Sequence, residues 1–162
     1  SREPGLAGAV LDSDTLWAGL IADGFHVDPA TIAIALRAKR GPAKIFLVTD
    51  AMAPIGTDMR SFMLNGREIR RENGRLTLAD GTLAGADLDM ISAVRFVHET
   101  IGLELDEALR MASLYPAQAV RQSHRMGRLA KGLAANLVHL SDRLAVRAVW
   151  IDGRQVFDSG GA

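Results

Sequence analysis

The stretch IFLVTD at residues 45–50 decides the fold, because it joins a short unbroken apolar run to a polar end. Runs of this kind are typical of parallel strands that are buried on both faces. A second apolar run precedes it at residues 16–22, and a helical pattern lies between the two at residues 31–40. Asp28 suits the N-cap of that helix, and Pro29 suits its first turn, where a missing N–H costs nothing. Strand, helix and strand in this order predict a βαβ unit, and therefore an α/β fold.

Downstream of residue 60, the pattern changes to short strands joined by tight turns. Asn65-Gly66 and Asn73-Gly74 separate these strands. Asn-Gly pairs are strong hairpin signals because both residues tolerate positive φ. We therefore expect a small antiparallel insert near residues 60–80, with strands at residues 61–64, 67–71 and 75–78.

Two helical patterns follow the insert, and β structure returns at the end of the chain. We expect the helices at residues 87–101, with Asp87 as N-cap, and at residues 104–114. Pro116 then opens a short helical segment. We predict two packing units. Residues 1–125 hold the βαβ unit, the insert and the helices, and residues 126–162 hold strands at 136–140, 145–151 and 155–157.

The composition limits the classes of function. The 162 residues carry 19 basic and 19 acidic side chains, so the basic excess typical of nucleic-acid-binding surfaces is missing. The absence of cysteine excludes disulfides and thiolate metal sites. No apolar run approaches the roughly 20 residues that span a bilayer, and the first residues carry no signal-peptide pattern. We expect a cytoplasmic protein with no nucleic-acid partner and no membrane partner.

Two side chains stand at the ends of the predicted parallel strands, where α/β proteins gather functional groups. Asp50 follows the apolar run of its strand, and His26 lies just beyond the run at residues 16–22. An Asp at this place serves as a general base or a metal ligand, and a His binds metal, phosphate or a proton. The spacing alone leaves structural interpretations open as well, with Asp50 as the cap of a turn and His26 as an ordinary loop residue.

The other three histidines form no His-x-His or His-Glu-x-x-His metal pattern. We expect His98 on the polar side of its helix, His124 in a basic stretch and His139 on the outer face of a strand. Small residues at 81–86 would let a ligand approach backbone groups beside a helix N-terminus, a place that favours anions. The alternative is a plain loop that ends at Asp87.

Four motifs occur together in an order and spacing that resemble a known family. They are REPGLAG at residues 2–8, IADGFHVD at 21–28, LVTDA at 47–51 and GTLAG at 81–85. The set is similar to that of the N-acetylglucosamine-6-phosphate deacetylase family, and its IADGFHVD part separates this family from other amidohydrolases. Two later stretches, MASLYPA at 111–117 and GRLAKG at 127–132, recur across the wider amidohydrolase superfamily. The resemblance covers essentially the whole chain.

The resemblance implies a fold and a reaction. Residues 1–125 would form the C-terminal portion of a TIM-type (β/α) barrel with the hairpin insert, and residues 126–162 would form part of a small accessory β-sandwich. The family hydrolyses the N-acetyl amide of N-acetylglucosamine 6-phosphate to glucosamine 6-phosphate and acetate. Asp50 matches the Asp that takes a proton from the metal-bound water and later protonates the leaving amine. One carboxylate can serve both steps because general acid and general base roles alternate along the reaction.

The same resemblance assigns the binding residues. His26 matches a His that contacts the substrate near its phosphate. Arg2 matches an Arg that reaches the phosphate from the neighbouring subunit of a homodimer, a role that suits the bidentate fork of a guanidinium. A loop that contacts the sugar through its backbone matches Leu83, Ala84 and Gly85.

The metal ligands of the family, a Glu and two His, precede the first residue of this chain, as does an Asn-Ala pair that helps to bind the substrate. A divalent metal, zinc or a similar ion, is therefore expected only in the full-length enzyme. We expect the chain to be the C-terminal half of a longer polypeptide, and we expect residues 1–162 alone neither to retain the metal nor to deacetylate. Two alternatives stay open: an amidohydrolase acting on a cyclic amide or an isoaspartyl dipeptide, and a non-catalytic fragment that binds a ligand or a partner.

Overall fold

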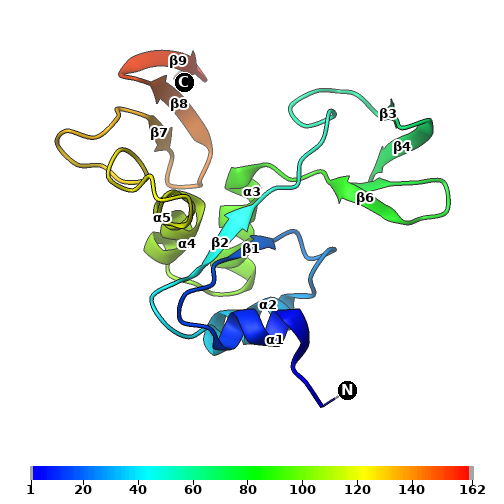
Figure 1. The fold of residues 1–162 in the computed structure, drawn as a ribbon. Coiled ribbons are helices and arrows are strands. Elements are labelled where there is room, and N and C mark those ends of the chain that lie inside the picture. The colour runs from blue at the N-terminus through cyan, green and yellow to red at the C-terminus, as the bar shows by residue number, and fades with distance from the viewer. Residues whose placement is uncertain (1, 161–162) are drawn as a thin grey trace.

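A βαβ unit lies at the centre of the molecule, as predicted (Figure 1). In the computed structural model, which describes residues 2–160, the two strands pair in parallel from Ala18 opposite Ile45 to Ile21 opposite Val48. The connecting helix begins where the sequence indicated, since the Asp28 carboxylate accepts a hydrogen bond from the backbone N–H of Ala30 at 2.8 Å. The unit consists of β1 (Ala18–Ile21), α2 (Pro29–Ala38) and β2 (Ile45–Val48).

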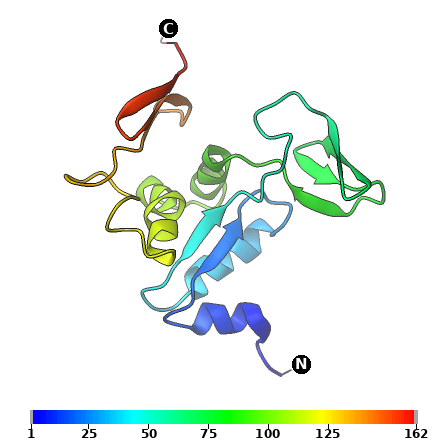
Figure 2. The ribbon, with the colours of Figure 1, turned by 45° about the horizontal axis from the view of Figure 1, so that its top comes forward.

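Helices lie on both flanks of this pair of strands. Figures 1 and 2 show α2 beside β1 with α1 next to α2, and α3, α4 and α5 beside β2. The shared core takes residues from both strands and from the helices on both flanks, including Leu47, Ile32 and Val97, which are at most 2% exposed. These further helices are α1 (Gly5–Asp12), α3 (Met90–Arg95), the π-helix η1 (Phe96–Thr100), α4 (Leu105–Ala112) and α5 (Leu114–Ala119).

The insert after β2 is an antiparallel sheet of four strands rather than three. The predicted Asn-Gly turns are confirmed, because Asn65 and Asn73 both adopt positive φ, at 50° and 52°. The fourth strand was expected as a loop, because its sequence is rich in small residues. The strands follow the chain order β3 (Ser61–Leu64), β4 (Arg67–Glu72), β5 (Arg75–Thr77) and β6 (Leu83–Ala86).

The end of the described chain forms its own antiparallel sheet, ordered β7-β8-β9. The Arg95 guanidinium of α3 donates to the Leu144 carbonyl before β8 at 3.1 Å, and this bond links the sheet to the helices. The strands are β7 (Leu137–Leu140), β8 (Val146–Ile151) and β9 (Arg154–Asp158). The division into units at residue 125 stays a prediction.

Three further local expectations were wrong. Pro116 does not open a helix, because α5 begins two residues earlier, at Leu114. The N-cap of α3 is Asp89, whose carboxylate accepts from the Ser92 N–H at 2.7 Å, because the backbone up to residue 86 is occupied in β6 and cannot yet turn into a helix. His98 is partly buried instead of solvated, since its Nδ1 lies 2.7 Å from the Leu103 carbonyl oxygen. Among residues 2–160, no helix is long and apolar enough to cross a membrane.

Candidate functional site

The two candidate side chains follow parallel strands that point to the same end of the molecule (Figure 2). His26 lies in the loop after β1, and Asp50 lies directly after β2. Because the strands are in register, their carboxyl ends meet at one edge, the usual place for functional groups in α/β folds. The fold therefore supports the pairing of these two residues in one site.

The loop after β1 is organised by Asp23. One carboxylate oxygen, Oδ1, accepts hydrogen bonds from the backbone N–H groups of Phe25 and His26, each at 2.9 Å. The other oxygen, Oδ2, lies 2.7 Å from Nδ1 of the His26 ring. The Asp23 side chain is 6% exposed and the His26 side chain 18%, so the pair is largely shielded from water. Sequence reasoning did not identify Asp23, although an acidic residue three positions before a loop His is a recognisable signal for such a turn.

The ionised form of Asp23 is favoured by this arrangement. Burial acts to raise the pKa of the carboxyl group, but the hydrogen bonds from the backbone and ring of His26 and from the backbone of Phe25 outweigh it. The pKa of Asp23 is therefore lowered from its ordinary value. A carboxylate carries no proton to donate, so the hydrogen bond between the side chains is donated by Nδ1–H of His26.

Neighbouring elements hold the same loop from two sides. A Cβ added to Gly24, which has a φ of +75°, would lie 3.1 Å from the Phe96 ring of η1, so the backbone passes close to that ring. On the other side, the Arg75 guanidinium of β5 stacks 4.2 Å from the centre of the Phe25 ring. Such a cation–π contact at an exposed site contributes about 0.5–1 kcal/mol. The insert thus contacts the His26 loop directly.

The backbone of Asp50 is hydrogen-bonded to a neighbouring strand, whereas its carboxylate is exposed. Its residue is exposed, and within residues 2–160 its carboxylate has no hydrogen bond or ion pair. Its backbone has a φ of +51°, which is unfavourable for most non-glycine residues although Asp tolerates it. The Asp50 carbonyl oxygen accepts from the Ala86 N–H at 2.9 Å, and Ala51 forms a parallel bridge with Ala86. An acid with these properties is available to exchange a proton.

The segment expected to contact the sugar, residues 83–85, is part of strand β6 and lies against this backbone. Between β5 and β6, Arg75 pairs with Ala86 and Thr77 pairs with Leu83, so β6 holds one extra residue, a β-bulge. Bulges of this kind re-aim backbone and side chains beside functional sites. Gly85, with a φ of +127°, makes the approach possible, since an added Cβ would lie 2.5 Å from Sδ of Met52. Leu83, Ala84 and Gly85 are therefore brought together with Asp50.

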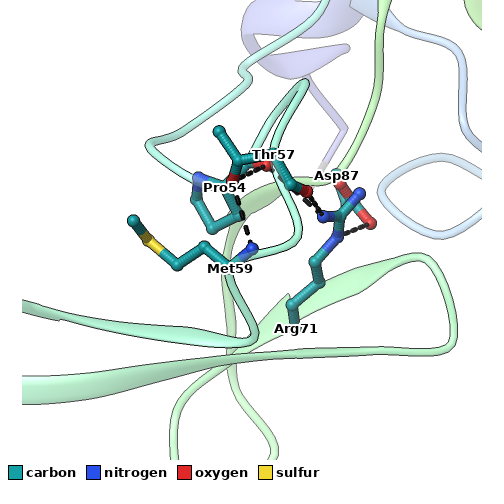
Figure 3. A network of polar contacts seen from close by, with 5 residues as sticks. All are labelled: Pro54, Thr57, Met59, Arg71 and Asp87. Atoms are coloured by element: carbon teal, nitrogen blue, oxygen red, sulfur yellow. Dashed lines mark hydrogen bonds and ion pairs between the residues drawn. The ribbon is translucent and has the colours of Figure 1, made fainter.

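A partly buried ion pair links the surrounding segments to one another, as Figure 3 shows. Nε of Arg71 donates to Oδ2 of Asp87 at 2.7 Å, and Nη1 donates to the Thr57 carbonyl at 2.6 Å and to the Pro54 carbonyl at 3.3 Å. Arg71 belongs to β4, Asp87 follows β6, and residues 54–57 follow Asp50. Sequence reasoning did not identify this network, because its partners are brought together only by the pairing of β4, β5 and β6.

Arg2 does not join the other candidates within one chain. It is exposed and precedes α1, and the N-terminal end lies opposite the end to which β1 and β2 point (Figures 1 and 2). Its expected contact with phosphate from a second subunit stays a prediction. No three His, Cys, Asp or Glu side chains gather into a metal-sized cluster anywhere in residues 2–160. The donors present here do not form a ligand set for a catalytic metal.

Comparisons with known proteins agree on one family. Residues 17–156 match the Amidohydrolase family. The chain is 41% identical over 159 residues to an N-acetylgalactosamine-6-phosphate deacetylase from Shewanella sp. (strain ANA-3), an alignment that covers 98% of this chain and 40% of that protein. Among solved structures, the N-acetylglucosamine-6-phosphate deacetylase from Pasteurella multocida has a TM-score of 0.86 and 36% identity, covering 91% of this chain and 38% of that one.

A further solved structure carries a ligand. It is an N-acetyl-D-glucosamine-6-phosphate deacetylase mutant from Mycobacterium smegmatis in complex with N-acetyl-D-glucosamine-6-phosphate, with a TM-score of 0.84 and 34% identity. That alignment covers 96% of this chain and 41% of the other. The chain therefore spans about 40% of the length of these relatives.

Proposed function

Since the chain belongs to the amidohydrolase family, we propose that it forms part of an enzyme that hydrolyses the N-acetyl amide of N-acetylglucosamine 6-phosphate to glucosamine 6-phosphate and acetate. One observation carries the proposal. The carboxylate of Asp50, which has no partner among residues 2–160, follows β2 at the edge where the His26 loop follows β1, and strand β6 is held against the Asp50 backbone.

Asp50 moves the proton in this proposal. As general base it takes a proton from the attacking water, and as general acid it returns that proton to the amide nitrogen when the C–N bond breaks. Its exposed carboxylate, with no partner among residues 2–160, is free to carry the proton in both directions. The backbone bond from Ala86 and the bridge at Ala51 keep the Asp50 backbone in place relative to β6.

The remaining candidates bind the substrate. We assign His26 to the phosphate end, because its ring is oriented by Asp23, and we assign the backbone of Leu83, Ala84 and Gly85 to the sugar. Arg2 reaches the phosphate from the neighbouring subunit of a homodimer. An arginine at that place matches the charge and the bidentate geometry of a phosphate.

A divalent metal, zinc or a similar ion, belongs to the complete enzyme in this proposal. When bound, such an ion lowers the pKa of a water molecule to about 7. Residues 2–160 do not supply its ligand set, so we place the ligands in the part of the enzyme that this chain does not span. We therefore expect the chain by itself to be inactive. The proposal also includes the (β/α) barrel for the βαβ portion, the accessory β-sandwich for β7–β9, and a cytoplasmic location.

A second candidate substrate is the C4 epimer, N-acetylgalactosamine 6-phosphate. The 41% identity to a deacetylase of that sugar phosphate favours it. The two sugars share the amide and the phosphate, so Asp50 and His26 would serve either one. Discrimination between them must come from groups that face the C4 hydroxyl.

The test is a comparison of kcat/KM for the two sugar phosphates and for N-acetylglucosamine without phosphate, using the full-length enzyme loaded with zinc. We expect turnover of at least one sugar phosphate with a strong preference over the sugar that lacks phosphate. Absence of turnover of both sugar phosphates, together with hydrolysis of a cyclic amide or an isoaspartyl dipeptide, would overturn the proposal. Inactivity towards all of these amides would favour a non-catalytic chain.

A further inference from the structure

The geometry points to Asp23 as a positioning residue that fixes the tautomer of His26 and aims Nε2 of its ring at the phosphate of the substrate. This inference rests on the proposed function, in which His26 meets the phosphate. It goes beyond that function because it assigns a role to a residue that does not itself contact the substrate. It also specifies which ring atom carries which proton.

The hydrogen bond between the two side chains runs in one direction. Oδ2 of Asp23 lies 2.7 Å from Nδ1 of His26, and an ionised carboxylate only accepts. Nδ1 therefore carries a proton and faces the carboxylate. In the neutral ring, Nε2 is then left with a lone pair.

Nε2 is the ring atom of His26 that remains available to a ligand. Within residues 2–160, no hydrogen bond reaches Nε2, and the side chain retains 18% exposure. The ring cannot turn over without breaking the 2.7 Å contact to Asp23. The backbone N–H of His26 is bound to the same carboxylate, so the ring and the main chain are held by one group.

The chemistry of the ligand determines the charge of the His26 ring in the complex. Phosphate oxygens accept hydrogen bonds, so the ring must carry a proton on Nε2 when it meets a phosphate. With Nδ1–H already held by Asp23, that ring is an imidazolium, which stands between the carboxylate and the phosphate. Hydrogen bonds that involve ionised groups are roughly twice as strong as neutral ones. Asp23 thereby supports a charged contact in place of a neutral one.

An Asn at position 23 distinguishes this role from ordinary loop packing. Asn at position 23 could still accept the two backbone hydrogen bonds through its Oδ1 atom. Its Nδ2 group, however, is a donor, and it would force Nδ1 of His26 to become an acceptor. The neutral ring would then carry its proton on Nε2. Asp23→Asn is therefore expected to preserve the loop and reverse the tautomer.

The experiment is nitrogen-15 NMR of the histidine rings, at a pH where His26 is neutral, on this chain and on its Asp23→Asn variant. We expect the protonated nitrogen of His26 to be Nδ1 in the natural chain and Nε2 in the variant, with little change in the backbone amide spectrum. Asp28→Asn is the matched control, since it removes one carboxylate from the same loop and leaves the helix N-cap intact. A natural chain whose neutral His26 carries its proton on Nε2 would overturn the inference, whatever the variant does.

A kinetic measurement on the full-length enzyme links the tautomer to the phosphate. We expect Asp23→Asn to raise KM for the sugar 6-phosphate by about tenfold, the loss of part of one charge-assisted hydrogen bond, with kcat nearly unchanged. The weak hydrolysis of the sugar without phosphate should not change. An equal loss for both sugars would indicate a structural role and overturn the inference. If the unaltered enzyme hydrolyses neither epimer, the proposed function fails, and the NMR result still decides whether Asp23 sets the ring.

Discussion

The loops that follow β1 and β2 reach the same edge of the molecule and are built in opposite ways. After β1, the functional side chain is held: Asp23 bonds the His26 ring and two backbone N–H groups. After β2, the backbone is held and the side chain is free: the Asp50 carbonyl is bonded to Ala86, whereas its carboxylate is exposed.

The difference matches the two tasks that we propose. A binding group gains from being fixed before the ligand arrives, because less side-chain entropy is lost on binding. A proton carrier must form and break hydrogen bonds with water and with the leaving group during the reaction. The comparison predicts that removing the Asp50 side chain affects chemistry, whereas removing the contacts around either loop affects stability or binding.

The largest effect is expected for Asp50→Asn in the full-length enzyme. We expect kcat to fall by about 10²–10⁴, the usual contribution of a general acid–base group, with the melting temperature unchanged since the side chain is exposed. Asp58→Asn is the control, an exposed carboxylate in the segment after β2. Steady-state kinetics and thermal melts measure both. A retained kcat would mean that Asp50 is only a turn residue.

Arg71→Ala should have the next largest effect, on stability. The substitution removes the partner of the Asp87 carboxylate, which is only 10% exposed to water. Oδ1 of Asp87 already has no partner in residues 2–160. Breaking a buried pair costs about 3–5 kcal/mol because it leaves an unpaired charge; this pair is only partly buried, so we expect a loss of about 2–3 kcal/mol in the free energy of unfolding.

The neighbouring Arg70 gives a matched control for that measurement. Arg70 pairs with Glu68 where both side chains are about half exposed, and such surface pairs contribute about 0–1 kcal/mol. Urea unfolding of Arg71→Ala and Arg70→Ala should therefore give clearly different losses. Equal losses would show that the Arg71 network does not hold the two segments together.

Gly85→Ala tests the contact between strand β6 and the segment around Asp50. At a φ of +127° an alanine is strained, and its Cβ would also press on Met52, so we expect a loss of about 1–3 kcal/mol. Gly81→Ala is the control, because its φ is +83° and an added Cβ meets nothing within 4 Å. Denaturant unfolding should show the larger loss for Gly85. Similar losses would mean that backbone strain alone, and not the contact with the Asp50 segment, matters there.

The smallest effect concerns pH and the His26 loop. The pKa of Asp23 is lower in the folded chain than its ordinary value of 3.8, so its ionised form stabilises the fold above that value. This contribution is lost as the pH falls through the folded pKa. The stability difference between the natural chain and Asp23→Asn should therefore shrink as the pH falls below about 4. A difference that does not change with pH would contradict the ionised Asp23.

Regular elements with strong local signals could be predicted from the sequence. The strand at residues 45–48 and the strand at residues 61–64 were predicted with the observed bounds, because unbroken apolar runs and Asn-Gly turns act over a few residues. The helix α1 was missed, since its sequence is Gly- and Ala-rich and its N-cap, Pro4, makes no side-chain hydrogen bond. β6 was missed because its strand character comes from pairing with β5, and three of its four residues are Ala or Gly.

Of the candidate site, only the residues at the ends of the two parallel strands could be predicted from their position in the sequence. Asp50 and His26 were visible because they follow apolar runs. The groups around them were not, since Asp23 meets the His26 ring only in the folded turn and Arg71 meets Asp87 only after β4, β5 and β6 have paired. The roles of the six candidate residues stay predictions until the variants are measured.

The parallel bridge between Ala51 and Ala86 closes the insert at its base. A long excursion of the chain therefore leaves the site and returns to it at two adjoining points. Because the entropy of closing a loop rises only slowly with its length, the turns of the hairpins could be lengthened or shortened at little entropic cost while both ends stay in position. Arg75 already brings one of these hairpins to the His26 loop. The insert is thus the part of the molecule in which evolution could change ligand preference without disturbing the proton carrier.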